Sequence, residues 1–96
     1  AFITEDESIY KAAVKHGFDV LKIRAGFIRL NGYPYGFLGG ASGLLDRDLL
    51  AVTGSLKIHP QYHEIVQFCE KYQVKICELS DQEPIDFGSI LPLYYA

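Results

Sequence analysis

A strand, a capped helix and a second strand follow one another twice in this chain, at a spacing of about 50 residues. The matched segments are residues 1–4 with 51–54, 20–23 with 74–77, and 26–30 with 87–91. Residue identity between the two copies is low, so the repeat is one of pattern. A single unit of this kind leaves apolar faces open, and such units are stable when they stack on neighbours. The pattern predicts an α/β fold built from repeated units.

The first copy is predicted to hold a helix followed by a strand. Thr4 and Glu7 have the spacing of a capping box, which indicates that a helix begins there. Gly17 can take the left-handed conformation that ends a helix. Residues 19–24 are mostly apolar, as a covered strand requires, and a turn-rich segment follows them. Residues 1–34 are therefore predicted to be a partial repeat unit.

The second copy is predicted to be more complete. Its expected strands are residues 37–45, 49–53, 74–79 and 85–93. The first two flank a charged turn and predict a hairpin. Pro60 suits the first position of a helix over residues 60–72, whose apolar residues fall at helical spacing and predict packing on a sheet. Residues 35–96 are therefore predicted to form a complete ββαβ unit plus a final strand.

Composition limits the classes of protein. The 96 residues suffice for one domain, and the first residue is Ala1 rather than Met, so we expect either a single domain or a fragment of a longer chain. The net charge of −3 and the scattered lysines and arginines give no basic surface for nucleic acid. No apolar run approaches the roughly 20 residues of a membrane helix. Two cysteines form no disulfide framework, and a cytoplasmic protein is expected.

Glycines crowd one part of the predicted hairpin. They are Gly36, Gly39, Gly40 and Gly43. A phosphate-binding loop would need a following Lys-Ser/Thr or a helix, and a hairpin follows here instead. Close approach of another backbone or side chain is the better interpretation.

Histidine and cysteine offer weak candidates for chemistry. His59 and His63 lie four residues apart near the start of a helix, but no third metal ligand is apparent. Cys69 and Cys77 fall in a helix stripe and a strand, where cysteine usually acts as a small apolar residue. We therefore expect no catalytic residue, metal or cofactor in this segment.

Asp86 is the candidate ligand-binding residue. It lies between Ile85 and Phe87, and burial there would require backbone amides or a cationic ligand as a partner. We expect Asp86 to form a site together with Gly39 and Gly40 of the hairpin strand and with Ser89. Tyrosines in the loop and at the C-terminus favour a contact surface or the edge of the core.

Three blocks of the sequence resemble a known family. They are YGFLGGASGLLD at 35–46, VTGSL at 52–56 with HP at 59–60, and DFGSILPL at 86–93. Together they resemble an uncharacterised bacterial family, typical of clostridia and relatives, with the guanidino-group modifying enzyme (pentein) fold. The resemblance implies an α/β propeller of ββαβ units, of which about two of five are present here.

The resemblance does not extend to the catalytic residues. Enzymes of that superfamily use a cysteine nucleophile in a C-terminal segment, where this chain has Gly88 or Ser89, and a histidine that residues 37–45 lack. The first hypothesis is a binding protein for a guanidino or amino-acid-like small molecule. The alternatives are a hydrolase or amidinotransferase completed by an N-terminal part, and a structural oligomerisation module. The expected partners are the remainder of its own chain, or further copies in a homo-oligomer.

Overall fold

The chain folds into a small mixed α/β domain. The computed structural model describes residues 1–88 and 90. Its elements are, in order, β1 (Phe2–Thr4), α1 (Glu7–Lys15), β2 (Val20–Lys22), η1 (Leu38–Gly40), β3 (Ser42–Asp46), β4 (Leu49–Val52), η2 (Leu56–Ile58), α2 (Tyr62–Lys71) and β5 (Lys75–Glu78), where η marks a 3₁₀ turn. Within the described part, no helix is long and apolar enough to cross a bilayer.

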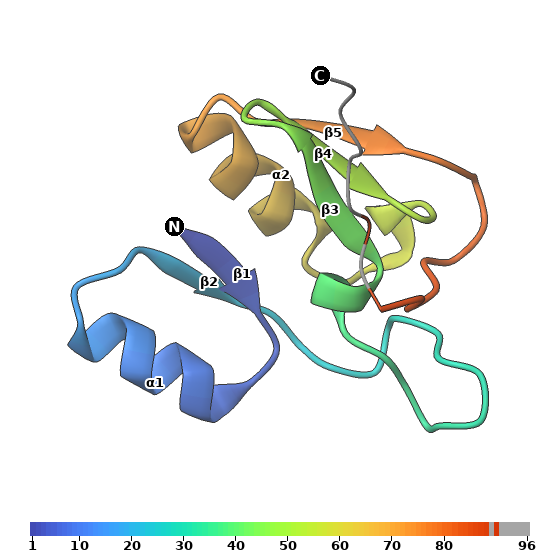
Figure 1. Ribbon diagram of the computed structural model, residues 1–96, viewed down its shortest axis with the longest axis horizontal. Coiled ribbons are helices and arrows are strands. Elements are labelled where there is room, and N and C mark those ends of the chain that lie inside the picture. The colour runs from blue at the N-terminus through green and yellow to red at the C-terminus, as the bar shows by residue number, and fades with distance from the viewer. Residues whose placement is uncertain (89, 91–96) are drawn as a thin grey trace, which may run out of the picture.

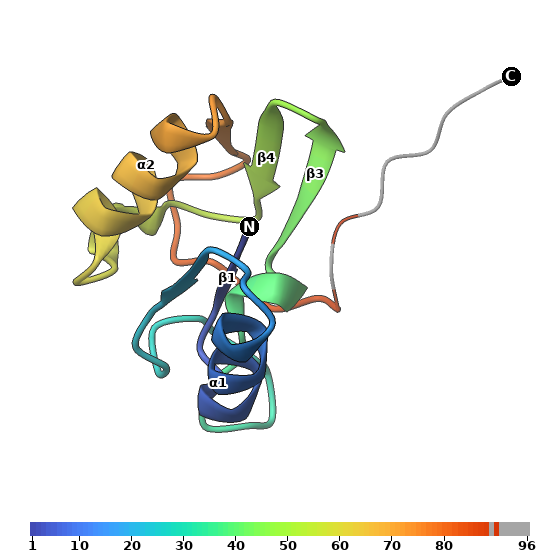
Figure 2. The same ribbon diagram turned by 90° about the vertical axis from the view of Figure 1, so that its left-hand side faces the viewer.

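The strands form two sheets, each with one helix (Figures 1 and 2). In the first sheet β1 pairs with β2 in parallel, and α1 connects them. In the second, β4 lies between β3, which is antiparallel to it, and β5, which is parallel to it and follows α2. Parallel neighbours need such a crossover, and a helix supplies it in both halves.

Both halves therefore contain a helix between two parallel strands, but the matching residues differ from the predicted ones. Thr4 O accepts from Ile23 N at 3.0 Å, and Val52 O accepts from Leu79 N at 2.9 Å. These equivalent bonds give offsets of 48 (52 − 4) and 56 (79 − 23), where the sequence pattern suggested 50 and 54. Each observed offset differs from the predicted one by two residues. Because side chains alternate between the two faces of a strand, a difference of two leaves the predicted face of each residue unchanged. A propeller of such units stays a prediction.

The first part of the predicted hairpin strand is wrong. Residues 38–40 form η1 rather than a strand, because Gly40 N donates to Phe37 O and Ala41 N donates to Leu38 O. The Ser42 hydroxyl also donates to Leu38 O at 2.6 Å and closes this turn. Gly39 and Gly40 consequently lie in a turn ahead of β3 and not within it.

The ends of the helices also differ from the predictions. Asp6, not Thr4, caps α1, and its carboxylate accepts from Ile9 N at 3.0 Å. Gly17 does end α1, with a φ of +82°. Helix α2 begins at Tyr62, two residues after Pro60, because Tyr62 N donates to His59 O and closes a turn over residues 60–61 ahead of the helix.

The predicted final strand, 85–93, lies only partly within the described residues. Ile85 forms a single parallel bridge with Arg29, and Ile90 N donates to Ser42 O at 3.0 Å. Ser89 and residues 91–93 lie outside the described residues.

One apolar core joins the two halves. Its buried members are Ile23, Ile28, Leu38, Ala41, Val52, Leu56, Ile65 and Cys69. Helix α2 supplies Ile65 and Cys69 from its predicted apolar stripe, whereas Tyr72 at the end of that stripe is exposed. The two halves fold together because neither sheet covers its own apolar face completely.

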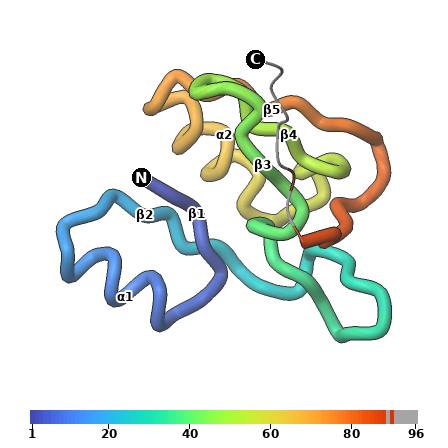
Figure 3. The backbone as a smooth tube through the Cα atoms, in the orientation of Figure 1, coloured from blue at the N-terminus to red at the C-terminus, as the bar shows by residue number. Residues whose placement is uncertain are grey.

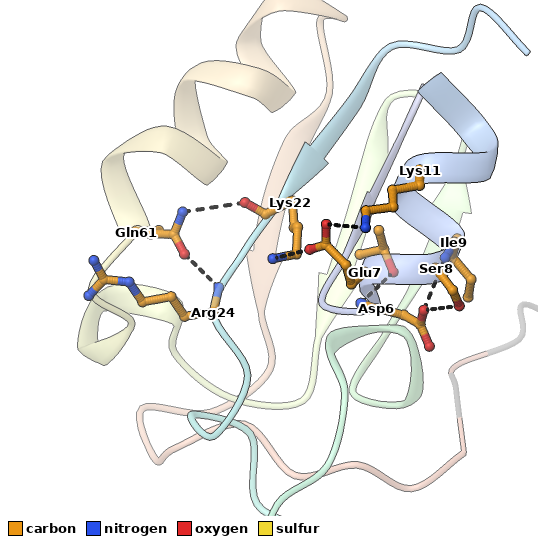
Figure 4. A network of polar contacts seen from close by, with 9 residues as sticks. Asp6, Glu7, Ser8, Ile9, Lys11, Lys22, Arg24 and Gln61 are labelled. Atoms are coloured by element: carbon orange, nitrogen blue, oxygen red, sulfur yellow. Dashed lines mark hydrogen bonds and ion pairs between the residues drawn. The ribbon is translucent and has the colours of Figure 1, made fainter. Parts of the chain in front are cut away.

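Polar contacts add to this junction (Figure 4). The side chain of Gln61 accepts from Arg24 N at 2.6 Å and donates to Lys22 O at 3.4 Å. At the other end of α2, Lys71 and Tyr72 both bind the carboxylate of Asp19. These contacts hold β2 against both ends of α2.

Candidate functional site

The segment that follows β5 runs beside the segment that follows β2 (Figure 3), and backbone hydrogen bonds there position Asp86. The segment after β5 returns to the segment after β2, where Asp86 N donates to Arg29 O at 2.7 Å. Phe87 N donates to Gly40 O at 3.0 Å. Backbone bonds on both sides of Asp86 therefore hold its side chain against η1.

The carboxylate of Asp86 is half-buried and is bound by backbone amides. Oδ2 accepts from Phe37 N at 3.1 Å, and Oδ1 accepts from Gly88 N at 2.9 Å. Backbone amides are one of the two kinds of partner expected for this residue from its apolar neighbours. The side chain thus joins the turn at residues 36–40 to the returning segment.

Glycine makes the approach of Asp86 possible. A Cβ atom at Gly40 would lie 1.7 Å from Asp86 Oδ1, and one at Gly36 would lie 2.5 Å from Asp86 Cβ. The expected close approach thus occurs at these positions, and also at Gly43, whose Cβ would lie 1.9 Å from Ile90 O. Gly39 differs, because no described atom lies within 4 Å of its Cβ position. Of the two glycines assigned to the site, only Gly40 contacts Asp86 in this way.

Glu5 is a second carboxylate at this place, and the sequence patterns did not single it out. It directly follows β1, and its Oε2 accepts from Leu38 N at 2.7 Å. Burial raises the pKa of Glu5, and the nearby charge of Asp86 raises it further, whereas the hydrogen bond from Leu38 N opposes the rise. Its position just beyond the carboxyl end of a parallel strand was the available signal, since ligands of α/β sheets bind at those ends.

The two carboxylates lie where no described cation balances them. Glu5 and Asp86 bind the successive amides of Leu38 and Phe37, and neither forms an ion pair with a described residue. Burial disfavours the charged form of Glu5 and is the main physical cause of its raised pKa, and no described cation offsets that effect. The arrangement can accept hydrogen bonds from a cationic group.

The other candidate residues lie elsewhere. Ser89 is outside the described residues. Cys69 is buried in the core and burial raises the pKa of its thiol, which disfavours a thiolate nucleophile, while Cys77 is half-buried in β5. Within residues 1–88 and 90, no group of three His, Cys, Asp or Glu side chains is placed to hold a metal ion.

His59 has structural partners. Its Nε2 lies 3.2 Å from Arg24 O, and its Nδ1 accepts from Gln61 N at 3.0 Å, so Nε2 carries the proton. Burial lowers its pKa. His59 therefore joins the loop after β2 to the start of α2 as a neutral imidazole.

The fold and this site define a mixed α/β domain with a carboxylate pair at the carboxyl end of a parallel strand. The chain belongs to the DUF6873 family, a family of unknown function, whose sequence profile matches residues 1–91. No curated protein and no solved structure matches the chain.

Proposed function

We propose that this chain binds a small cationic ligand, of the guanidino or amino-acid type, at Glu5 and Asp86. The observation that carries the proposal is the half-buried carboxylate of Glu5, which has a raised pKa and no cationic partner among the described residues. A bound cation would relieve the repulsion between the two carboxylates. It would supply the charge balance that the described residues lack.

The free acceptor positions suit a planar cation. Glu5 Oε2 accepts from Leu38 N, and the backbone amide of Glu5 itself also interacts with the carboxylate. A carboxylate has about four acceptor positions, so positions remain for a ligand. A guanidinium carries parallel N–H donors that match carboxylate oxygens, and such charge-assisted bonds are about twice as strong as neutral ones. An ammonium group would fit as a point charge with less geometric selection.

Binding rather than catalysis is proposed for this segment. The described loops around Glu5 and Asp86 hold no cysteine or histidine, and the Cys69 thiol lies in the core with a raised pKa. The proposal includes the ββαβ propeller architecture, supported by the parallel strand pair and crossing helix of each half.

Thermal unfolding with added ligands tests the proposal. Agmatine, arginine and methylarginines should raise the midpoint, since a ligand at 100 times its Kd stabilises by about 2.7 kcal/mol. Citrulline differs from arginine only in a neutral urea group in place of the guanidinium, so it is the matched control for arginine and should give a smaller shift.

The Glu5→Gln variant separates site binding from general salt effects. It keeps an acceptor for Leu38 N and removes the charge. The proposal expects the agmatine shift to disappear in this variant. Equal shifts for arginine and citrulline, or an agmatine shift that survives in Glu5→Gln, would contradict it.

A further inference from the structure

The outer edge of β1 is an open strand position. Phe2 N donates to Asp19 O at 3.2 Å and Thr4 O accepts from Ile23 N at 3.0 Å, so the backbone groups of Phe2 and Thr4 face β2. Alternate residues of a strand direct these groups to opposite edges. The N–H and C=O of Ile3 therefore face away from β2, where no described strand pairs with β1.

The second half of the chain contains the same edge with a strand on it. Because Thr4 corresponds to Val52, Ile3 corresponds to Ala51. Ala51 pairs with Gly43 of β3, which runs antiparallel to β4. In the second half, an antiparallel strand therefore pairs with the edge that corresponds to the outer edge of β1.

The other edges of the two described sheets, on β2, β3 and β5, either carry hydrogen-bonding partners or present charged side chains. The amide side chain of Gln61 takes the place of a strand at the outer edge of β2, as Figure 4 shows. Ile90 N donates to Ser42 O on the outer edge of β3. The edge strand β5 carries Lys75 and Glu78, and charged side chains are typical of solvated edges.

An apolar cavity of about 250 Å³ borders β1. Ala1, Phe2 and Ile3 line it on one side, and Leu44 and Phe68 line it from β3 and α2. It is smaller than the roughly 300–1,000 Å³ of drug-sized ligand sites. Its size and apolar lining suit the side chains of one added strand.

We propose that an extended strand pairs antiparallel with the outer edge of β1, and that this strand belongs to the same polypeptide and directly precedes Ala1. Ala1 corresponds to Leu49 (49 − 48), the first residue after the two-residue turn Arg47-Asp48 that joins β3 to β4. A strand joined to Ala1 by an equally short turn reaches the edge of β1 directly. This proposal is independent of the ligand at Glu5 and Asp86.

The chain supplies its own test sequence. A copy of residues 41–48, placed directly ahead of Ala1, reproduces the strand and turn that precede Leu49. The grafted chain should melt about 4–8 °C higher than the 96-residue chain. Hydrogen exchange at the Ile3 amide should slow by about tenfold or more, because that amide gains a backbone acceptor.

A proline control separates strand pairing from added length. Gly43→Pro in the grafted copy removes the N–H that pairs with Ile3 and should abolish both effects. No gain in midpoint or protection from the graft overturns the proposal. A slowly exchanging Ile3 amide in the ungrafted chain, with a dimer in light scattering, also overturns it, because a second copy would then fill the edge.

Discussion

Replacement of Gly40 by alanine should displace Asp86 from its site. The new Cβ would lie 1.7 Å from Asp86 Oδ1 and 2.2 Å from Asp86 Cγ, far inside any permitted contact. Backbone bonds on both sides of Asp86 oppose a simple retreat of the carboxylate. Gly40→Ala should therefore break the bonds that Asp86 accepts from Phe37 N and Gly88 N.

The expected cost follows from those two bonds. A hydrogen bond to a charged group contributes about 1.5–3 kcal/mol, and because Asp86 is only half-buried, water recovers part of that. We expect Gly40→Ala to lower the free energy of unfolding by about 2–4 kcal/mol, including overpacking. The midpoint of thermal unfolding, followed by circular dichroism, should fall by at least about 8 °C.

Gly39→Ala is the matched control on the adjacent residue. No described atom lies within 4 Å of its Cβ position, so the free energy of unfolding should change by no more than about 0.5 kcal/mol. Asp86→Ala in the Gly40→Ala background should cost less than in the wild-type chain, because Gly40→Ala has already broken the two hydrogen bonds of Asp86 and the second substitution removes the carboxyl group that clashes. Equal midpoints for Gly40→Ala and Gly39→Ala would refute the steric reasoning.

Three further predictions concern charge and the junction between the halves. Because the folded-state pKa of Glu5 is raised, its ionisation lowers the free energy of unfolding as pH rises through that pKa. The free energy of unfolding of Glu5→Gln, measured in urea, should therefore rise relative to that of wild type between pH 4 and pH 7. A difference between the two proteins that does not change with pH would contradict this. The folded-state pKa of His59 is lowered, so the free energy of unfolding of wild type should fall as pH falls below about 6.5. His59→Gln should lack that loss, and parallel profiles of stability against pH for the two proteins would contradict the prediction. Gln61→Ala should speed hydrogen exchange at the Arg24 amide, its bonded partner, and unchanged exchange there would show that the bond does not form in solution.

The helices and strands were largely predictable from local patterns. The apolar spacing of 62–72 and the left-handed glycine at position 17 depend on residues close in sequence, and the structure has α2 and the end of α1 there. The error at residues 37–41 has a specific cause. Apolar and glycine residues there fit a strand equally well, and the hydrogen bond from Ser42 to Leu38 O that closes η1 leaves no periodic signal.

The candidate site was only half predictable. Asp86 stood out because its neighbours are apolar, and Gly40 was expected to allow a close approach. Glu5 lies 81 residues before Asp86 (86 − 5), and only the return of the segment after β5 to η1 brings the two carboxylates together. A contact of that kind depends on the tertiary fold, so the local capping-box pattern around Thr4 could not predict that Glu5 lies near Asp86.

The pKa of the Glu5 carboxyl, measured by ¹³C NMR titration with and without agmatine, tests the proposed cation site most directly. Without ligand the pKa should lie above its usual range, because burial and the charge of Asp86 both disfavour ionisation. With saturating agmatine it should fall, since a bound cation stabilises the carboxylate. A pKa that stays the same at saturating agmatine would contradict the proposal that Glu5 and Asp86 bind a cationic ligand.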